Sequence, residues 1–99
     1  MTRRVLPNRR HNETVRFEFN GGKHCFTVSR FDDGSVAEVF TSVHYGAGAA
    51  EESYARDAAI ILSLALQYGA SLAIIRHAIT RDDKSRPATL IGAIVDALE

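Results

Sequence analysis

The chain has 99 residues, 45% of them hydrophobic and 24% charged, and its formal net charge at pH 7 is zero. This composition is typical of one globular domain and excludes wholesale disorder, and two separate cores in so short a chain would each be marginal. The longest apolar run, 58–62, is far below the ~20 residues of a membrane span, and no apolar signal core follows the first residues. We therefore expect a cytoplasmic protein without membrane contact.

Positive charge is concentrated near the N-terminus, where residues 1–23 carry five arginines and one lysine against two glutamates. We interpret residues 1–12 as a basic, flexible arm and residues 13–99 as one domain. Guanidinium groups pair with phosphate oxygens, so the arm is a candidate contact for a nucleotide or a nucleic acid. A solvated tail is the alternative interpretation. The candidate phosphate contacts are Arg3, Arg4, Arg9 and Arg10.

Three strands are predicted in the first half of the chain. Residues 14–19 alternate apolar and polar side chains, which places Val15, Phe17 and Phe19 on one buried face. Further strands are predicted at 24–31 and 35–41, because the residues between the strands favour tight turns. These turn sequences are Asn20-Gly21-Gly22 and Asp32-Asp33-Gly34.

The third predicted strand has apolar residues on both faces. Simple alternation puts Val36 and Phe40 on one face and Ala37 and Val39 on the other. One face of the sheet is then covered by helices. The other face also carries apolar residues, which would need a second covering layer. We interpret that second cover as another subunit.

Three helices are predicted in the second half. Residues 51–68 form the longest, ended by Gly69, and Ile60 and Leu64 widen its apolar stripe. That stripe consists of Tyr54, Ala58, Ile61, Leu62, Ala65 and Leu66. Ser71 is predicted to cap a second helix over 72–80, and Thr89 or Ser85 begins a third that ends near Leu98.

Because strands and helices are segregated along the chain, the predicted class is α+β. The expected architecture is a three-stranded antiparallel meander followed by three helices packed on one face.

The segment between the third strand and the longest helix is the best candidate for a ligand site. Its glycines let backbone amides approach a ligand, and it leads into a helix N-terminus that attracts anions. The alternative is a plain turn in which Glu51 and Glu52 cap the helix. The candidate ligand-binding residues are Ser42, His44, Gly46 and Gly48.

Metal binding and catalysis have weaker support in the sequence. The four histidines show no paired ligand spacing, so we predict no metal and no cofactor, with Cys25 and His44 as the weak candidate ligands. Cys25 or Ser42 could act as a nucleophile with His44 as base, but no known nucleophile motif surrounds them. We assign no catalytic residue, and the sequence favours a protein that is not an enzyme without deciding the question.

Six short matches together resemble the TSCPD domain, a small module at the C-terminal end of cobalamin-dependent (class II) ribonucleotide reductases that also occurs as a stand-alone protein. The resemblance covers about residues 6–98. The matches are LPNRR at 6–10, FDDG at 31–34, AEVF at 37–40, RDAA at 56–59, SLALQ at 63–67 and IRHA at 75–78.

The family is named for a Thr-Ser-Cys-Pro-Asp string, from which this chain departs. Thr41 and Ser42 match, but Val43, His44 and Tyr45 follow instead. Any thiol or metal role of the family's cysteine is therefore not carried over, and the resemblance places the reductase's catalytic residues outside this module.

Two hypotheses follow from the residues and the resemblance. The first is a non-catalytic accessory module, linked to deoxyribonucleotide metabolism, that self-associates or binds a protein partner. The second is a nucleotide, anion or nucleic-acid binder that uses the basic arm and the glycine loop.

Overall fold

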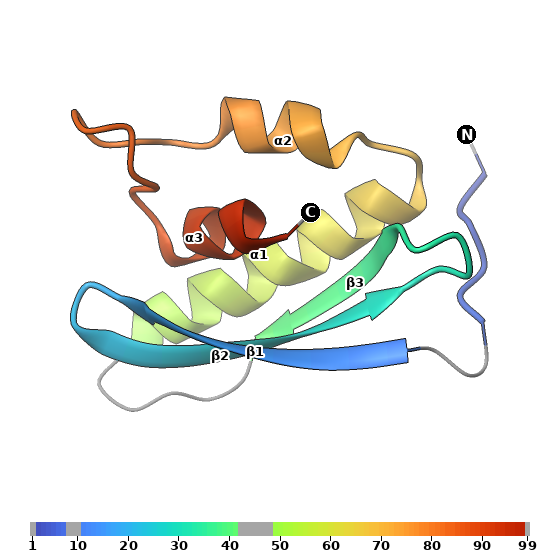
Figure 1. Ribbon diagram of the computed structural model, residues 1–99, viewed down its shortest axis with the longest axis horizontal. Coiled ribbons are helices and arrows are strands. Elements are labelled where there is room, and N and C mark those ends of the chain that lie inside the picture. The colour runs from blue at the N-terminus through green and yellow to red at the C-terminus, as the bar shows by residue number, and fades with distance from the viewer. Residues whose placement is uncertain (1, 8–10, 42–48, 99) are drawn as a thin grey trace.

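The computed structural model of this chain describes residues 2–7, 11–41 and 49–98. Its strands form one antiparallel sheet in the order β1-β2-β3, and the helices lie on one side of that sheet (Figure 1). The elements are β1 (His11–Phe19), β2 (Gly22–Arg30), β3 (Val36–Thr41), α1 (Ala49–Gln67), α2 (Leu72–Ala78) and α3 (Leu90–Ala97). The predicted α+β fold is confirmed.

A two-residue turn joins β1 to β2. Asn20 and Gly21 have φ values of 50° and 78°, as a type I′ turn requires, and Phe19 pairs with Gly22 across it. The other end of β1 lies three residues before the predicted start. Polar pairs extend the ladder there: Ser29 Oγ donates to Asn12 Oδ1 at 2.6 Å. Because the side chains at this end of β1 are polar, they do not alternate with apolar ones, and the sequence pattern did not reveal that the strand begins here.

A β-bulge changes which side chains of β3 face the core. Glu38 pairs with Ser29 but Val36 pairs with Arg30, so Ala37 is an additional residue on β3. Val36 therefore joins Val39 in the core, whereas Phe40 is 51% exposed. The prediction that Val36 and Phe40 share a face is wrong, because the bulge resets the alternation.

The core lies between the sheet and helices α1 and α3. It combines large side chains from the middle and edge strands with the inner faces of both helices. Its buried members are Phe26, Val28, Val36, Val39, Leu62, Leu66, Ile94, Val95 and Leu98. Leu72 and Ile75 on α2, and Ile79 directly after it, pack against this cluster and are partly buried.

Helix α1 faces the sheet with a different stripe from the one predicted. Tyr54 is 75% exposed and Ile61 is 68% exposed, so both were wrongly predicted to be buried. Two polar residues stand in the buried stripe, which consists of Ala55, Ala59, Leu62, Ser63, Leu66 and Gln67. Apolar periodicity could not identify this face, because α1 carries apolar side chains around most of its circumference.

Ser63 and Gln67 are buried because they satisfy the outer edge of β3. Ser63 Oγ accepts a hydrogen bond from the Val39 amide at 2.8 Å and donates to the Ala59 carbonyl at 2.8 Å. Gln67 Nε2 donates to the Ala37 carbonyl at 3.0 Å. Unpaired backbone groups at a buried strand edge are costly, so these side chains close the edge that α1 covers.

Helix ends follow the local signals in the sequence. Gly69 has a φ of 100°, and the amides of Gly69 and Ala70 bond back to the carbonyls of Leu66 and Ala65, which is a Schellman ending. Ser71 caps α2 as predicted, and Thr89, rather than Ser85, caps α3.

Candidate functional site

Part of the basic N-terminal segment contacts the end of α1. Arg3 Nε donates to Gln67 Oε1 at 2.6 Å, and the Arg4 amide donates to the Gln67 carbonyl at 2.8 Å. Gln67 therefore connects the N-terminal segment to the carbonyl of Ala37 on β3. Arg9 and Arg10 lie outside the described residues, and whether residues 1–12 move as a flexible arm stays a prediction.

The Arg4 guanidinium also has protein partners. It lies 3.7 Å from the centre of the Phe31 ring and 3.3 Å from Asp33 Oδ2. Hydrogen bonds from Ser35 lower the pKa of Asp33, and the charge of Arg4 adds to this effect. Arg3 and Arg4 thus already pair with protein groups, and a phosphate contact at either would have to compete with those partners.

The other candidate residues from the sequence do not form a site among the described residues. Ser42, His44, Gly46 and Gly48 all lie outside them. Cys25 is half-buried on the outer face of the sheet, and adjacent His24 points to the opposite face. Within the described ranges, no group of three side chains could hold a metal ion. In the same part of the chain, no helix has the length and hydrophobicity needed to cross a membrane.

An apolar groove lies between the three helices. It has a volume of about 340 Å³, and none of its lining residues is charged or polar. The lining residues are Ala58, Ile61, Leu62, Ala65, Ile75, Ile79, Ile91 and Val95. The small side chains of Ala58 and Ala65, seven residues apart on α1, leave space between α1 and α2.

Exposed apolar side chains border this groove on α1. Tyr54, Ile61 and Tyr68, which directly follows the last residue of α1, recur every seven residues, so they form a line along the helix beside Ala58 and Ala65. Leu64 lies next to that line and is also exposed. We call Tyr54, Ile61, Leu64 and Tyr68 the α1 ridge. Exposed apolar side chains of this kind make the surface a candidate contact site for another molecule.

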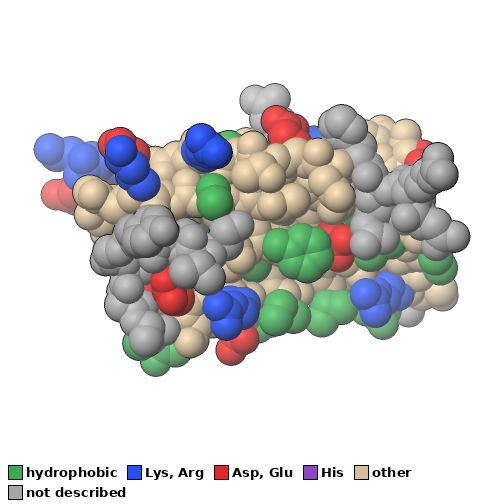
Figure 2. Space-filling view, turned by 90° about the horizontal axis from the view of Figure 1, so that it is seen from below, with side chains coloured by type: hydrophobic (Ala, Val, Ile, Leu, Met, Phe, Trp, Pro, Cys, Tyr) green, Lys and Arg blue, Asp and Glu red, His purple; other side chains and the backbone are tan. Residues whose placement is uncertain are grey.

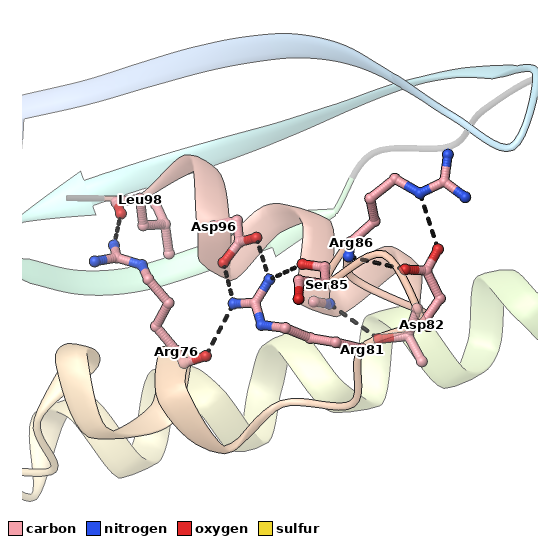
Figure 3. A network of polar contacts seen from close by, with 9 residues as sticks. Arg76, Arg81, Asp82, Ser85, Arg86, Asp96 and Leu98 are labelled. Atoms are coloured by element: carbon pink, nitrogen blue, oxygen red, sulfur yellow. Dashed lines mark hydrogen bonds and ion pairs between the residues drawn. The ribbon is translucent and has the colours of Figure 1, made fainter.

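Helix α2 forms one wall of the groove and contains no fully buried residue. A polar network fixes it in place against α3. Arg81, just after α2, forms two hydrogen bonds of 2.8 and 2.7 Å to Asp96 on α3 and one of 3.1 Å to the Arg76 carbonyl (Figure 3). Arg76 in turn donates to the Leu98 carbonyl. The connection between α2 and α3 thus fixes the two helices against each other, and neither alternation nor periodicity in the sequence indicates this role.

The Arg81–Asp96 pair makes the stability of the folded chain depend on pH. The hydrogen bonds from Arg81, followed by the charges of Arg81 and Arg76, lower the pKa of Asp96. A lowered pKa in the folded state means that the pair contributes stability above the unfolded pKa of about 3.9 and loses it as pH falls through the folded value.

We expect Asp96→Asn to melt at a lower temperature than the parent at pH 7 and to converge with it near the folded pKa of Asp96. Circular dichroism melts between neutral and acidic pH measure this difference. The matched control is Asp57→Asn, which changes an exposed carboxylate of α1. A gap between parent and Asp96→Asn that stays constant with pH would contradict the role of the ion pair.

The described residues define a small α+β module with an apolar groove between its helices. The chain is similar to part of vitamin B12-dependent ribonucleotide reductases. It is 39% identical over 70 residues to the enzyme of Agrobacterium fabrum and 37% identical over 70 residues to that of Bradyrhizobium diazoefficiens. These matches cover 71% of this chain but only 5% and 6% of the two enzymes.

The predicted resemblance to a ribonucleotide reductase module is therefore confirmed. No protein-family model matches the chain. No solved structure is significantly similar to it. The narrower TSCPD label stays a prediction.

Proposed function

We propose that this chain is a non-catalytic interaction module of a vitamin B12-dependent ribonucleotide reductase system, and hence linked to deoxyribonucleotide formation. The observation that carries the proposal is the α1 ridge beside the apolar groove. The partner that we assign to it is the remaining body of such a reductase. The similarity to a short segment of these long enzymes supports this choice.

The length of the relatives suggests why the surface is apolar. In those enzymes the segment similar to this chain is joined to a polypeptide many times its size. We propose that the module buries this apolar face against the larger protein to which it is joined. The groove and the α1 ridge together present apolar side chains, and a helix of the partner would fit them, as in other helix-in-groove complexes.

The non-catalytic part of the proposal rests on the size and chemistry of the chain. The match leaves about nineteen-twentieths of each relative outside the similar segment, and we assign the chemistry of the reaction to that remainder. The residues that line the groove carry no acid, base or nucleophile, and the only side-chain polar groups of the α1 ridge are the hydroxyls of Tyr54 and Tyr68. These surfaces therefore fit binding better than reaction.

The Ile61→Asp variant tests this proposal. Ile61 is exposed and contributes to both the ridge and the groove, so aspartate should leave the fold intact while placing a charge in the contact. The binding partner is the purified Agrobacterium fabrum reductase from which the similar segment has been deleted. Because burying an unpaired charge is costly, we expect Ile61→Asp to bind roughly a hundredfold more weakly than the parent chain in biolayer interferometry.

Val5→Asp is the matched control, because Val5 is an exposed apolar residue away from the groove. It should bind as tightly as the parent chain. Circular dichroism would show that both variants remain folded. The proposal is refuted if the parent chain does not bind the truncated reductase, or if Ile61→Asp binds it as well as the parent does.

A further inference from the structure

The two edges of the sheet differ in how they are covered. The outer edge of β3 is closed by α1 through Ser63 and Gln67. The outer edge of β1 pairs with no strand among the described residues, although β1 is nine residues long. An open edge of this length presents backbone amides and carbonyls that can pair with another strand.

The β1–β2 turn determines which backbone groups face outward. A two-residue turn closes with a hydrogen-bonded pair, here Phe19 and Gly22, and such pairs alternate along an antiparallel ladder. The backbone groups of Phe17 and Phe19 therefore point toward β2, whereas those of Arg16 and Glu18 point toward the open edge. Both Arg16 and Glu18 have exposed side chains.

We propose that a second copy of this chain pairs with this edge, β1 to β1 in antiparallel orientation, with the two-fold axis at Phe17. Arg16 of each copy then lies opposite Glu18 of the other, and the outward backbone groups of both residues form the hydrogen-bonded pairs. Phe17 faces its own copy across the axis, and Val15 faces Phe19. The result is a continuous six-stranded sheet.

Charge complementarity selects this register. Centring the pair on Arg16 places two arginines directly opposite each other, which is destabilising. Centring it on Val15 places Glu13 opposite Phe17 and leaves no pair of opposite charges. With the axis at Phe17, two opposite-charge pairs form on the outer face of the sheet. Figure 2 shows that this face carries charged side chains of both signs beside exposed apolar ones.

This inference goes beyond the proposed function, since it uses β1 and leaves the helical groove free. The two surfaces lie on different elements, so a failure of β1 pairing would not affect the test of reductase binding. In the same way, a chain that fails to bind the reductase could still form this dimer.

Charge reversal tests the proposed pairing by sedimentation velocity of the full chain. In Arg16→Glu, two glutamates face each other at each pair, and in Glu18→Arg two arginines do. Because each variant turns two attractive pairs into repulsive ones, each should raise the dimer dissociation constant roughly tenfold or more. The double variant, Arg16→Glu with Glu18→Arg, restores opposite charges and should restore the dimer.

Glu13→Lys is the matched control, because it changes an exposed glutamate of β1 that has no partner in this register. Its dissociation constant should equal that of the parent chain. Circular dichroism melts would show that the variants are folded, which separates loss of pairing from loss of structure. Three results would overturn the proposal: a parent chain that stays monomeric, single reversals without effect, or a double variant that dimerises no better than the single ones.

Discussion

Phe26→Ala should cost this chain about 3 to 5 kcal/mol of its free energy of unfolding. The Phe26 side chain is fully buried in the centre of β2, where its ring meets Phe17 edge to face at 5.7 Å. Truncation removes its apolar contacts with both layers and leaves a cavity that the surrounding strands cannot fill. Since small domains have only about 5 to 15 kcal/mol in total, much of the stability would be lost.

Urea unfolding followed by circular dichroism measures this effect, and Phe40→Ala is the control. Phe40 undergoes the same chemical change on the neighbouring strand, but the β3 bulge leaves half of its side chain exposed. We expect Phe40→Ala to lose no more than about 1.5 kcal/mol. Equal losses for the two variants would contradict the assignment of Phe26 to the core and Phe40 to the outer face.

The Gln67→Ala variant should lose about 2 to 4 kcal/mol. The side chain is only 2% exposed, and its amide connects α1 with both the Ala37 carbonyl and the Arg3 guanidinium. Alanine leaves the Ala37 carbonyl at the covered edge of β3 without this donor and opens a cavity. Both effects lower the stability of the folded state, and the contact of Arg3 with the domain is lost as well.

Two further variants separate the causes in the same urea experiment. Gln67→Leu fills much of the volume but cannot donate to the Ala37 carbonyl, so it should still lose about 1 to 3 kcal/mol. Arg3→Ala removes only the contact between the Arg3 side chain and Gln67, and it should lose at most about 1 kcal/mol. If Gln67→Leu were as stable as the parent chain, the hydrogen bond to β3 would have no stabilising role.

The sequence predicted individual residues of the candidate site but not how they are arranged around the groove. The apolar residues of α1 were recognised in the sequence, but Ile61 was expected in the core rather than on the surface. The second wall of the groove depends on the Arg81–Asp96 pair, whose members are far apart in the sequence. The residues singled out for ligand binding between β3 and α1 lie outside the described residues, so their role stays a prediction.

The sequence by itself determined the local features of the fold, because neighbouring residues carry their own signals. Asn20-Gly21 specifies the hairpin, Gly69 ends α1, and Ser71 caps α2. The segregation of strands and helices likewise determined the α+β class.

Only the tertiary structure decided which side of α1 faces the sheet. Apolar residues surround most of this helix, so hydrophobicity alone left its rotation open. The uncovered edge of β3 selected the face with Ser63 and Gln67, because that face satisfies the backbone groups of Val39 and Ala37. This choice turned Tyr54, Ile61 and Tyr68 outward and created the apolar surface on which the proposed function depends.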